Sequence, residues 1–210
     1  MYLPEAFAET RPGVLFALIR AHPFGLLVSI GPEGPLVSPV PFTLAADEGE
    51  RGTLRAHVAR TNPHWRALAE RPEALALFPG PEAYVTPSWY ATKRETGKVV
   101  PTWNYVMVEA RGRAAAVEDP VWLRAQIEAL TTSMEAARPE PWAVADAPER
   151  FVASQIRGIV GIELPIAAIA GKWKLSQNRP AADRRCVAEG LARQGDAAMA
   201  GLVGAADPDP

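Results

Sequence analysis

Prolines and glycines occur along the whole chain and limit how long any regular element can be. The 210 residues include 21 prolines and 16 glycines, whereas average usage would make the two types together roughly 12% of a chain. They follow no fixed period. This distribution predicts many short elements with abrupt ends, as in a β-barrel with accessory helices.

Alternation of apolar and polar residues predicts about seven strands. The pattern is clearest at 53–59, where Leu54, Ala56 and Val58 alternate with polar side chains. The other expected strands are 25–31, 36–44, 74–78, 82–90, 99–117 and 159–169, with a turn at 79–81 and a bend at Gly112. No β-helix-β alternation recurs. The expected fold class is therefore mainly β with peripheral helices (α+β), built as a small antiparallel barrel.

The segments 25–31 and 36–44 should form a hairpin around the turn at 31–34. Pro39 and Pro41 lie in its second arm. Because proline has no N–H to donate to a ladder, this arm is expected to be an edge or bulged strand.

Helix-start signals predict the peripheral helices. The clearest follows Asp119 and Pro120, with an apolar stripe of Leu123, Ile127, Leu130 and Met134. Further helices are expected between Pro12 and Pro23, from Asn62 to residue 70, at 149–156 and after Pro180. We expect one domain over residues 1–203, followed by a disordered tail at 204–210.

Composition and missing motifs exclude several classes of function. The net charge is −2, so no basic surface for nucleic acid or anionic membrane is evident. The longest apolar stretch, 159–170, contains Glu163 and Pro165 and is too short to span a membrane. One cysteine, Cys186, and no secretory leader pattern predict a cytoplasmic protein. The phosphate-loop, dinucleotide, serine-hydrolase and zinc-protease motifs are absent, and three scattered histidines predict no metal site.

Two groups of residues could bind a ligand. His57, Arg60, Asn62 and Trp65 cluster where a strand ends and a helix starts, a junction that offers backbone N–H groups and a guanidinium to an anion. The alternative is a solvent-facing strand histidine. Trp65, Trp89 and Trp103 each lie beside polar residues; they could form an aromatic wall for a planar ligand, or simply pack in the barrel.

The segment 171–179, GKWKLSQNR, is the third candidate. Strand alternation would place Lys172, Lys174, Ser176 and Asn178 on one face. The segment could hold a phosphate, form a solvated strand end, or extend a DNA-binding patch with the nearby Arg184 and Arg185.

Seven motifs together resemble the PaiB family of FMN-binding negative transcriptional regulators. They run in order over nearly the whole chain: MYLPEAF (1–7), HPF (22–24), SPVPF (38–42), HVARTNPHW (57–65), YVTPSWY (84–90), VPTWNYV (100–106) and KWKLSQNR (172–179). Thr61 and Trp173 are mild departures from the familiar pattern. The resemblance implies a split β-barrel of the flavin-reductase and pyridoxamine-phosphate-oxidase-like type, a homodimer with FMN between the subunits, and DNA binding by family label only.

The resemblance also implies which residues contact FMN, while leaving any catalytic residue unknown. The phosphate would be held by His57, Val58, Ala59, Arg60 and Asn62, and the ring would lie beside Ser38, Pro39 and Val40. Candidates to close the site, including from the partner subunit, are Trp89, Trp103, Lys174, Gln177, Asn178 and Arg179. Three functions stay open: a regulator, an oxidoreductase that passes electrons from a nicotinamide to a small substrate, and a flavin-storing or haem-handling protein.

Overall fold

The computed structural model describes residues 1–206, and the chain divides into two compact units. The terminal unit comprises Met1–Leu15, Pro79–Val108 and Ala170–Pro210; the central unit comprises Phe16–Phe78 and Glu109–Ile169. Four elements contribute residues to both: α1 (Pro12–Ala21), β6 (Glu73–Val85), β7 (Thr102–Arg113) and β9 (Ile159–Lys174). The single domain expected over 1–203 stays a prediction.

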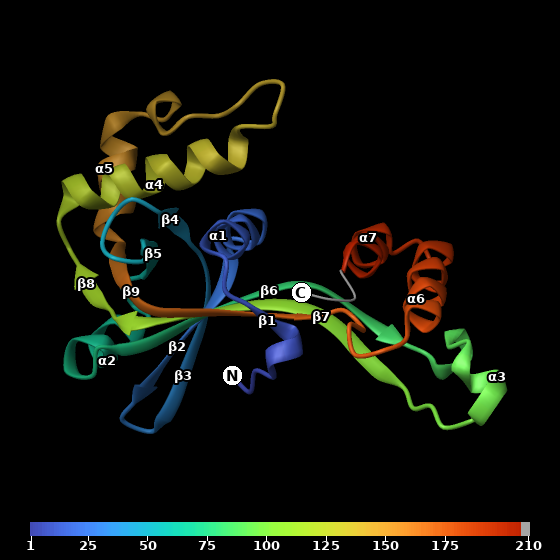
Figure 1. The fold of residues 1–210 in the computed structure, drawn as a ribbon. Helices are drawn as coiled ribbons and strands as arrows, with labels where there is room; N and C mark the ends of the chain where they lie inside the picture. The colour runs from blue at the N-terminus through green and yellow to red at the C-terminus, as the bar shows by residue number, and fades with distance from the viewer. Residues whose placement is uncertain (207–210) are drawn as a thin grey trace. The chain divides into compact units, whose positions relative to one another are not determined.

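Antiparallel strands form the framework of the central unit (Figure 1). β2 (Phe24–Gly31) pairs with β3 (Gly34–Pro41) along its whole length and with β6 through Leu26–Val28. β5 (Thr53–Ala59) pairs with β4 (Thr43–Ala45) and with β9, which also pairs with β8 (Ala115–Val117). β3 lies at an end of the strand order. The edge position expected from its prolines is therefore confirmed.

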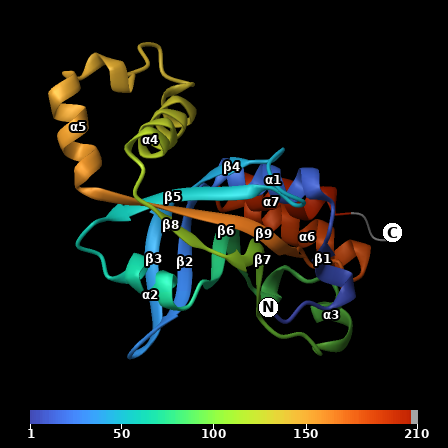
Figure 2. The same ribbon diagram turned by 90° about the vertical axis from the view of Figure 1, so that its left-hand side faces the viewer.

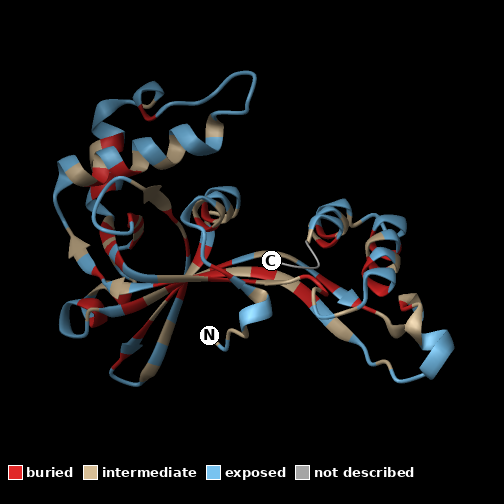
Figure 3. Ribbon diagram, viewed as in Figure 1, coloured by how far each residue is buried: buried red, intermediate tan, exposed pale blue. Residues whose placement is uncertain are grey.

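Helices α4 (Pro120–Glu135) and α5 (Glu149–Arg157) lie side by side in the central unit (Figures 1 and 2). The backbone N–H of Val121 donates to Asp119 Oδ1 at 3.0 Å, which caps α4 as the sequence indicated. The helices, with η3 (Val144–Asp146) between them, share a small core of Leu123, Val144, Val152 and Ile156. Only the first half of the expected stripe on α4 is covered, because Met134 is 46% exposed. Figure 3 shows the exposed outer side of this helix.

Gly161 determines how closely α4 approaches β9. A Cβ atom at this position would come within 2.2 Å of the Trp122 ring. The absent side chain therefore leaves room for Trp122 to lie against the strand, where its Nε1–H donates to Glu163 at 3.2 Å.

The terminal unit combines strand segments with short helices. It contains η1 (Glu5–Phe7), β1 (Ala8–Glu9), η2 (Pro87–Trp89), α3 (Thr92–Thr96), α6 (Ala181–Arg193) and α7 (Ala197–Ala205). β1 pairs with the end of β9. Helices α6 and α7 pack against each other (Figure 1) through side chains such as Val187 and Val203.

Three local expectations differ from the structure. Residues 79–81 do not form a turn, because β6 continues through them; proline fits an extended backbone where its missing N–H faces no neighbour. The single strand expected over 99–117 is divided into β7, which contains Gly112, and β8; a Cβ at Gly112 would meet the Pro165 carbonyl at 2.1 Å. The sequence analysis expected a disordered tail from residue 204 and no helix α7, but Gly204 and Ala205 belong to that helix. Residues 207–210 of the expected tail lie outside the described residues.

Within residues 1–206, no helix is both long and apolar enough to cross a membrane. The same residues contain no group of three or more His, Cys, Asp or Glu side chains placed to hold a metal ion.

Candidate functional site

In the central unit, a buried hydrogen-bond network joins the β2–β3 hairpin to the start of α2 (His64–Glu70). His64 is 1% exposed; its Nε2 lies 2.8 Å from Ser29 Oγ and its Nδ1 lies 2.9 Å from Ser38 Oγ. Asn62 Nδ2 donates to Ser38 Oγ at 3.1 Å, and the His64 backbone N–H donates to Asn62 Oδ1 at 2.9 Å. Two expected site residues, Ser38 and Asn62, are therefore in direct contact.

Burial lowers the pKa of His64, so the neutral ring is favoured. A neutral imidazole donates from one nitrogen and accepts at the other. If Nδ1 accepts, the Ser38 hydroxyl hydrogen is used within the network. If Nδ1 donates, that hydrogen is available to a ligand, because Ser38 Oγ then accepts from both His64 and Asn62. The tautomer of His64 thus determines whether Ser38 can donate.

Arg60 already uses its guanidinium inside the central unit. Nε donates to the Arg157 carbonyl at 2.9 Å, Nη2 donates to the Ile159 carbonyl at 3.1 Å, and Nη1 lies 2.5 Å from Glu118 Oε2. The side chain is 37% exposed. To contact a phosphate, Arg60 would have to exchange its partnership with Glu118 for the ligand.

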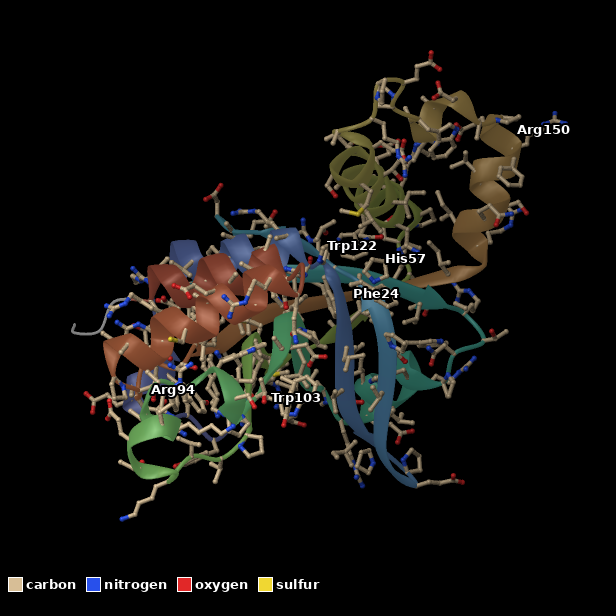
Figure 4. All side chains as sticks on the ribbon, turned by 90° about the vertical axis from the view of Figure 1, so that its right-hand side faces the viewer. Phe24, His57, Arg94, Trp103, Trp122 and Arg150 are labelled. Atoms are coloured by element: carbon tan, nitrogen blue, oxygen red, sulfur yellow. The ribbon has the colours of Figure 1, made fainter. Side chains whose placement is uncertain are left out.

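The other β5 residues of the expected phosphate site point in two directions. Val58 is 3% exposed and packs inward, whereas His57 and Ala59 lie on the opposite face. His57 Nδ1 lies 2.7 Å from Oε1 of Gln126 on α4. Figure 4 shows His57 and Trp122 where β5 meets α4. His57 is therefore held by the helix rather than facing solvent alone.

The three hairpin residues expected beside the flavin ring are also divided. Ser38 and Val40 are buried, and Pro39 is exposed. Pro39 belongs to an outer face on which the cross-strand register pairs only apolar residues. This outer face consists of Phe24, Leu26, Val28, Ile30, Pro35, Val37, Pro39 and Pro41. Phe24, labelled in Figure 4, is 65% exposed.

The terminal unit contains a pocket of about 520 Å³. Trp103, Tyr105 and Tyr2 supply aromatic walls, and Glu82 and Lys172 are its charged residues. Lys172 is 8% exposed; its Nζ donates to the Tyr2 carbonyl at 3.0 Å and lies 5.4 Å from the ring centres of Tyr2 and Tyr105. Trp103 (Figure 4) is 51% exposed and contacts Tyr84 edge to face at 6.0 Å. The pocket suits a planar organic molecule.

Most polar groups of the segment 171–179 have partners within the terminal unit. Lys174 Nζ donates to Thr102 Oγ1 at 2.5 Å and to the Trp103 carbonyl at 2.9 Å, and burial lowers its pKa. Gln177 accepts from Leu175 N at 2.7 Å and donates to the Trp173 carbonyl at 2.6 Å. These bonds fix the segment as the connection between β9 and α6.

Ser176 and Arg179 complete the connection, and Asn178 is exposed. Ser176 has a positive φ of 66°, which ends the strand alternation expected to continue to Asn178; its Oγ accepts from Asn104 Nδ2 at 3.0 Å. The Arg179 guanidinium lies 4.7 Å from the centre of the Tyr90 ring. Of the six residues expected to close the site, only Trp103 lines the pocket. Trp89 instead lies against α6, where a Cβ at Gly190 would meet its ring at 2.4 Å.

Sequence reasoning missed His64, Ser29, Tyr105 and the aromatic surroundings of Lys172. The contacts of His64 depend on residues 26 and 35 positions away in the sequence, a relation that strand alternation cannot give. Its position inside the motif HVARTNPHW was the one available signal.

Relatives of known sequence match almost the whole chain. A protein of Aspergillus fumigatus, described as uncharacterized, is 36% identical and the match covers 97% of this chain and 95% of the relative. A protein of Emericella nidulans is 37% identical, and the match covers 93% of this chain and 92% of the relative. The Bacillus subtilis protein named "Protease synthase and sporulation protein PAI 2" is 29% identical over 91% and 89%.

Solved structures show the fold at lower identity. The FAD and heme binding protein from Mycobacterium smegmatis has a TM-score of 0.59 and 18% identity, over 80% of this chain and 73% of that one. A flavocytochrome from Azotobacter vinelandii has a TM-score of 0.58 and 17% sequence identity, and the match covers 80% of this chain and 69% of that one. The expected split-barrel fold is confirmed.

The sequence model of the family described as "Putative FMN-binding domain" matches residues 1–168, which is most of the chain. Together with the Bacillus relative, this match confirms both the family and the cofactor, FMN, that the sequence motifs indicated. The chain belongs to this family of FMN-binding domains.

Proposed function

We propose that this flavin-binding protein is an oxidoreductase in which FMN is held at the β5–α2 turn and the β2–β3 hairpin of the central unit. The observation that carries the proposal is the Ser38–Asn62–His64 network, with distances of 2.9 Å and 3.1 Å at Ser38 Oγ. It orders neutral hydrogen-bonding groups on the hairpin whose residues the family resemblance implies as neighbours of the cofactor. Such groups fit the acceptor-rich rim of a flavin and its ribityl chain.

When bound, FMN would supply two-electron transfer between a reduced nicotinamide and a second substrate. The residues of this chain bind and orient: Asn62 holds Ser38, and the tautomer of His64 sets the direction of the Ser38 hydroxyl. No acid or base is required of them, since hydride transfer depends mainly on positioning.

The terminal pocket supports an oxidoreductase over a DNA-binding regulator. Its aromatic walls and buried Lys172 suit a planar aromatic molecule that carries negative charge. In contrast, many arginines of the described residues are paired with carboxylates, including Arg11, Arg55, Arg60, Arg113 and Arg124. Paired arginines of this kind give little continuous positive surface for a phosphate backbone.

We further propose a homodimer in which the outer face of the β2–β3 hairpin is covered by a second copy. The support is the absence of any charged or polar residue among the eight side chains of that face. A contiguous apolar surface of this kind marks an interaction site. A cytoplasmic location fits a flavin reduced by nicotinamide and is part of the same proposal.

Purified protein tests the function directly. We expect a flavin absorbance spectrum, or uptake of added FMN, followed by bleaching of that absorbance when NADH or NADPH is added without oxygen. A protein that takes up no FMN would contradict the whole proposal. FMN uptake without reduction by either nicotinamide, combined with salt-sensitive retention of a promoter fragment, would replace the oxidoreductase with the regulator.

A further inference from the structure

The two C-terminal helices, α6 and α7, form a pocket of their own in the terminal unit. Both helices follow residue 168, the last residue that the family model matches. The pocket has a volume of about 260 Å³. Its lining from α6 is Ala181, Arg184, Arg185, Ala188 and Glu189, and its lining from α7 is Val203 and Gly204.

Among the described residues, nothing compensates the buried charge that Arg184 brings to the lining of this pocket. The residue is 8% exposed, and its Nη1 is buried without a hydrogen-bond partner. Among residues 1–206, no carboxylate forms an ion pair with it. An arginine keeps its charge at any pH that a protein survives, so it cannot avoid the cost of burial by losing a proton. Breaking or omitting the partner of a buried charge is strongly destabilising.

The neighbouring carboxylate does not compensate this charge. Asp183 is fully buried, but its Oδ1 accepts from the Thr92 backbone N–H at 2.9 Å and its Oδ2 accepts from Thr92 Oγ1 at 2.8 Å. Asp183 therefore fixes the start of α3 to α6 and is engaged there. Asp183 and Arg184 are also successive residues of one helix, so their side chains leave it in directions about 100° apart.

Two further features add positive potential to the pocket. Arg185 lines it beside Arg184. Ala181, the first residue of α6, also lines it, and this helix of 13 residues begins without a side-chain cap. The first backbone N–H groups of a helix have no partner within the helix and carry the positive end of its dipole.

Glu189 is the acidic residue of the pocket, and it has a cation of its own. Its carboxylate lies 3.7 Å from Arg193 Nη1, one turn further along α6. Glu189 can accept a hydrogen bond from a hydroxyl group, and with Arg184 and Arg185 both in the lining the pocket keeps a net positive charge. The remaining lining residues, Ala188, Val203 and Gly204, are small or apolar.

We propose that the α6–α7 pocket binds the phosphate group of a small phosphate monoester. The dianion would neutralise Arg184 and Arg185 and accept from the start of α6, which is the combination that phosphate groups select in proteins. The volume left beside the phosphate and the acceptor Glu189 suit a short hydroxylated substituent. None of the lining residues of this pocket is among the residues proposed to bind FMN, so the two proposals rest on different side chains.

The test is thermal unfolding of the FMN-saturated protein, titrated with inorganic phosphate or glycerol phosphate against sodium chloride at equal ionic strength. A ligand that binds only the folded state raises the melting temperature, by about 5–10 °C at a hundredfold excess over Kd for a chain of this size. We expect such a rise, and a larger one with glycerol phosphate. A monoester response no greater than that to inorganic phosphate would overturn the monoester assignment.

Variants locate the response. Arg184→Met and Arg185→Gln should abolish it, whereas Arg94→Gln, which removes an exposed arginine of α3 outside the pocket lining, should keep it. Ala188→Asp supplies a carboxylate inside the pocket, so it should raise the melting temperature in chloride and remove the phosphate response. This variant keeps Arg184 and so tests the site even if Arg184→Met does not fold.

Two outcomes would overturn the site. One is a wild-type protein whose unfolding does not respond to either phosphate compound. The other is a response that survives both Arg184→Met and Ala188→Asp but disappears in Arg60→Gln, because the anion would then bind at the proposed FMN residues. FMN uptake and flavin reduction are measured separately, so failure here is distinguishable from failure of the proposed function.

Discussion

Ser38 Oγ lies 2.9 Å from His64 Nδ1, which ties the middle of β3 to the first residue of α2. With Ser29 on the other nitrogen of the ring at 2.8 Å, His64 spans both strands of the hairpin. The hairpin and the turn that follows β5 are thereby held as one piece of the central unit, and the residues proposed to face FMN are positioned by one buried ring.

This ring should make stability depend on pH. Burial lowers the folded-state pKa of His64 below its ordinary value of 6.5, so the unfolded chain binds more protons in the interval between the two values. Stability is therefore complete above pH 6.5 and falls as the pH decreases through the lowered folded pKa. Chemical denaturation between pH 7.5 and pH 5 measures this, and His64→Leu should flatten the slope. The matched control, His22→Leu, should keep the slope of the wild-type protein. An unchanged slope in His64→Leu would show that His64 is not the source of the pH dependence.

Ser38 and Ser29 contact the same ring but should affect FMN differently. Ser38 also accepts from Asn62, a residue of the proposed site. Ser38→Ala should weaken FMN binding by about fivefold, the effect of one ordinary hydrogen bond. Ser29→Ala removes a comparable bond to His64 and should lower stability with little change in affinity. Flavin fluorescence titration of both variants decides, and equal losses of affinity would show that the effect is only structural.

The pairing of Arg60 with Glu118 gives a test of the expected phosphate contact. If Arg60 binds the FMN phosphate, the ligand competes with Glu118 for the guanidinium, whose Nη1 lies 2.5 Å from Glu118 Oε2. Glu118→Gln should then strengthen FMN binding by up to about fivefold, since partly exposed ion pairs contribute at most about 1 kcal/mol. Arg60→Ala should weaken binding. If neither variant changes affinity, Arg60 does not bind the FMN phosphate, and its role is only to link the end of β5 to the start of β9.

The apolar outer face of the hairpin should govern assembly. Val37 is 56% exposed at its centre, opposite Val28 in the register. Val37→Lys would bury a charge in the proposed dimer contact and should give a monomer in analytical ultracentrifugation. Val121→Lys is the control, because Val121 is 77% exposed on α4 and lies outside this face. A Val37→Lys protein that sediments as a dimer would rule out this surface.

The aromatic wall of the terminal pocket should affect catalysis. Trp103→Ala should raise the KM for the nicotinamide or the second substrate by about 2- to 12-fold, the effect of one aromatic contact, with little change in FMN affinity. Trp142→Ala, which removes an equally exposed tryptophan of the central unit, should leave both unchanged. Steady-state reduction of the bound flavin measures the effect. Identical kinetics in the Trp103 variant would remove the pocket from the reaction.

The sequence predicted those parts of the fold that depend on neighbouring residues. β5 has the bounds 53–59 that its alternation indicated, α4 begins after its Asp119 cap, and the prolines of β3 correctly place it at an edge. Each is a local property of spacing, capping or a missing N–H. The turn expected at 79–81 was wrong. The fixed φ of proline fits an extended strand as well as a turn, and β6 continues through these residues.

The candidate site was predicted less completely, since its chemistry comes from contacts between distant residues. Asn62 and Ser38 were expected separately, but only the folded chain shows that Asn62 donates to Ser38 and that His64 lies between the serines. The cations of 171–179 looked available in the sequence, whereas Lys174 is bound to Thr102 and Trp103. Composition cannot show which charges are already neutralised or held.

The three prolines of β3 have a consequence for the newly made chain. Before any partner arrives, the hairpin presents an apolar face and an edge strand together, a combination that favours fibre growth by strand addition. Pro35, Pro39 and Pro41 remove N–H donors along that edge. The hairpin can therefore associate through its flat side while its backbone cannot act as a template for polymerisation.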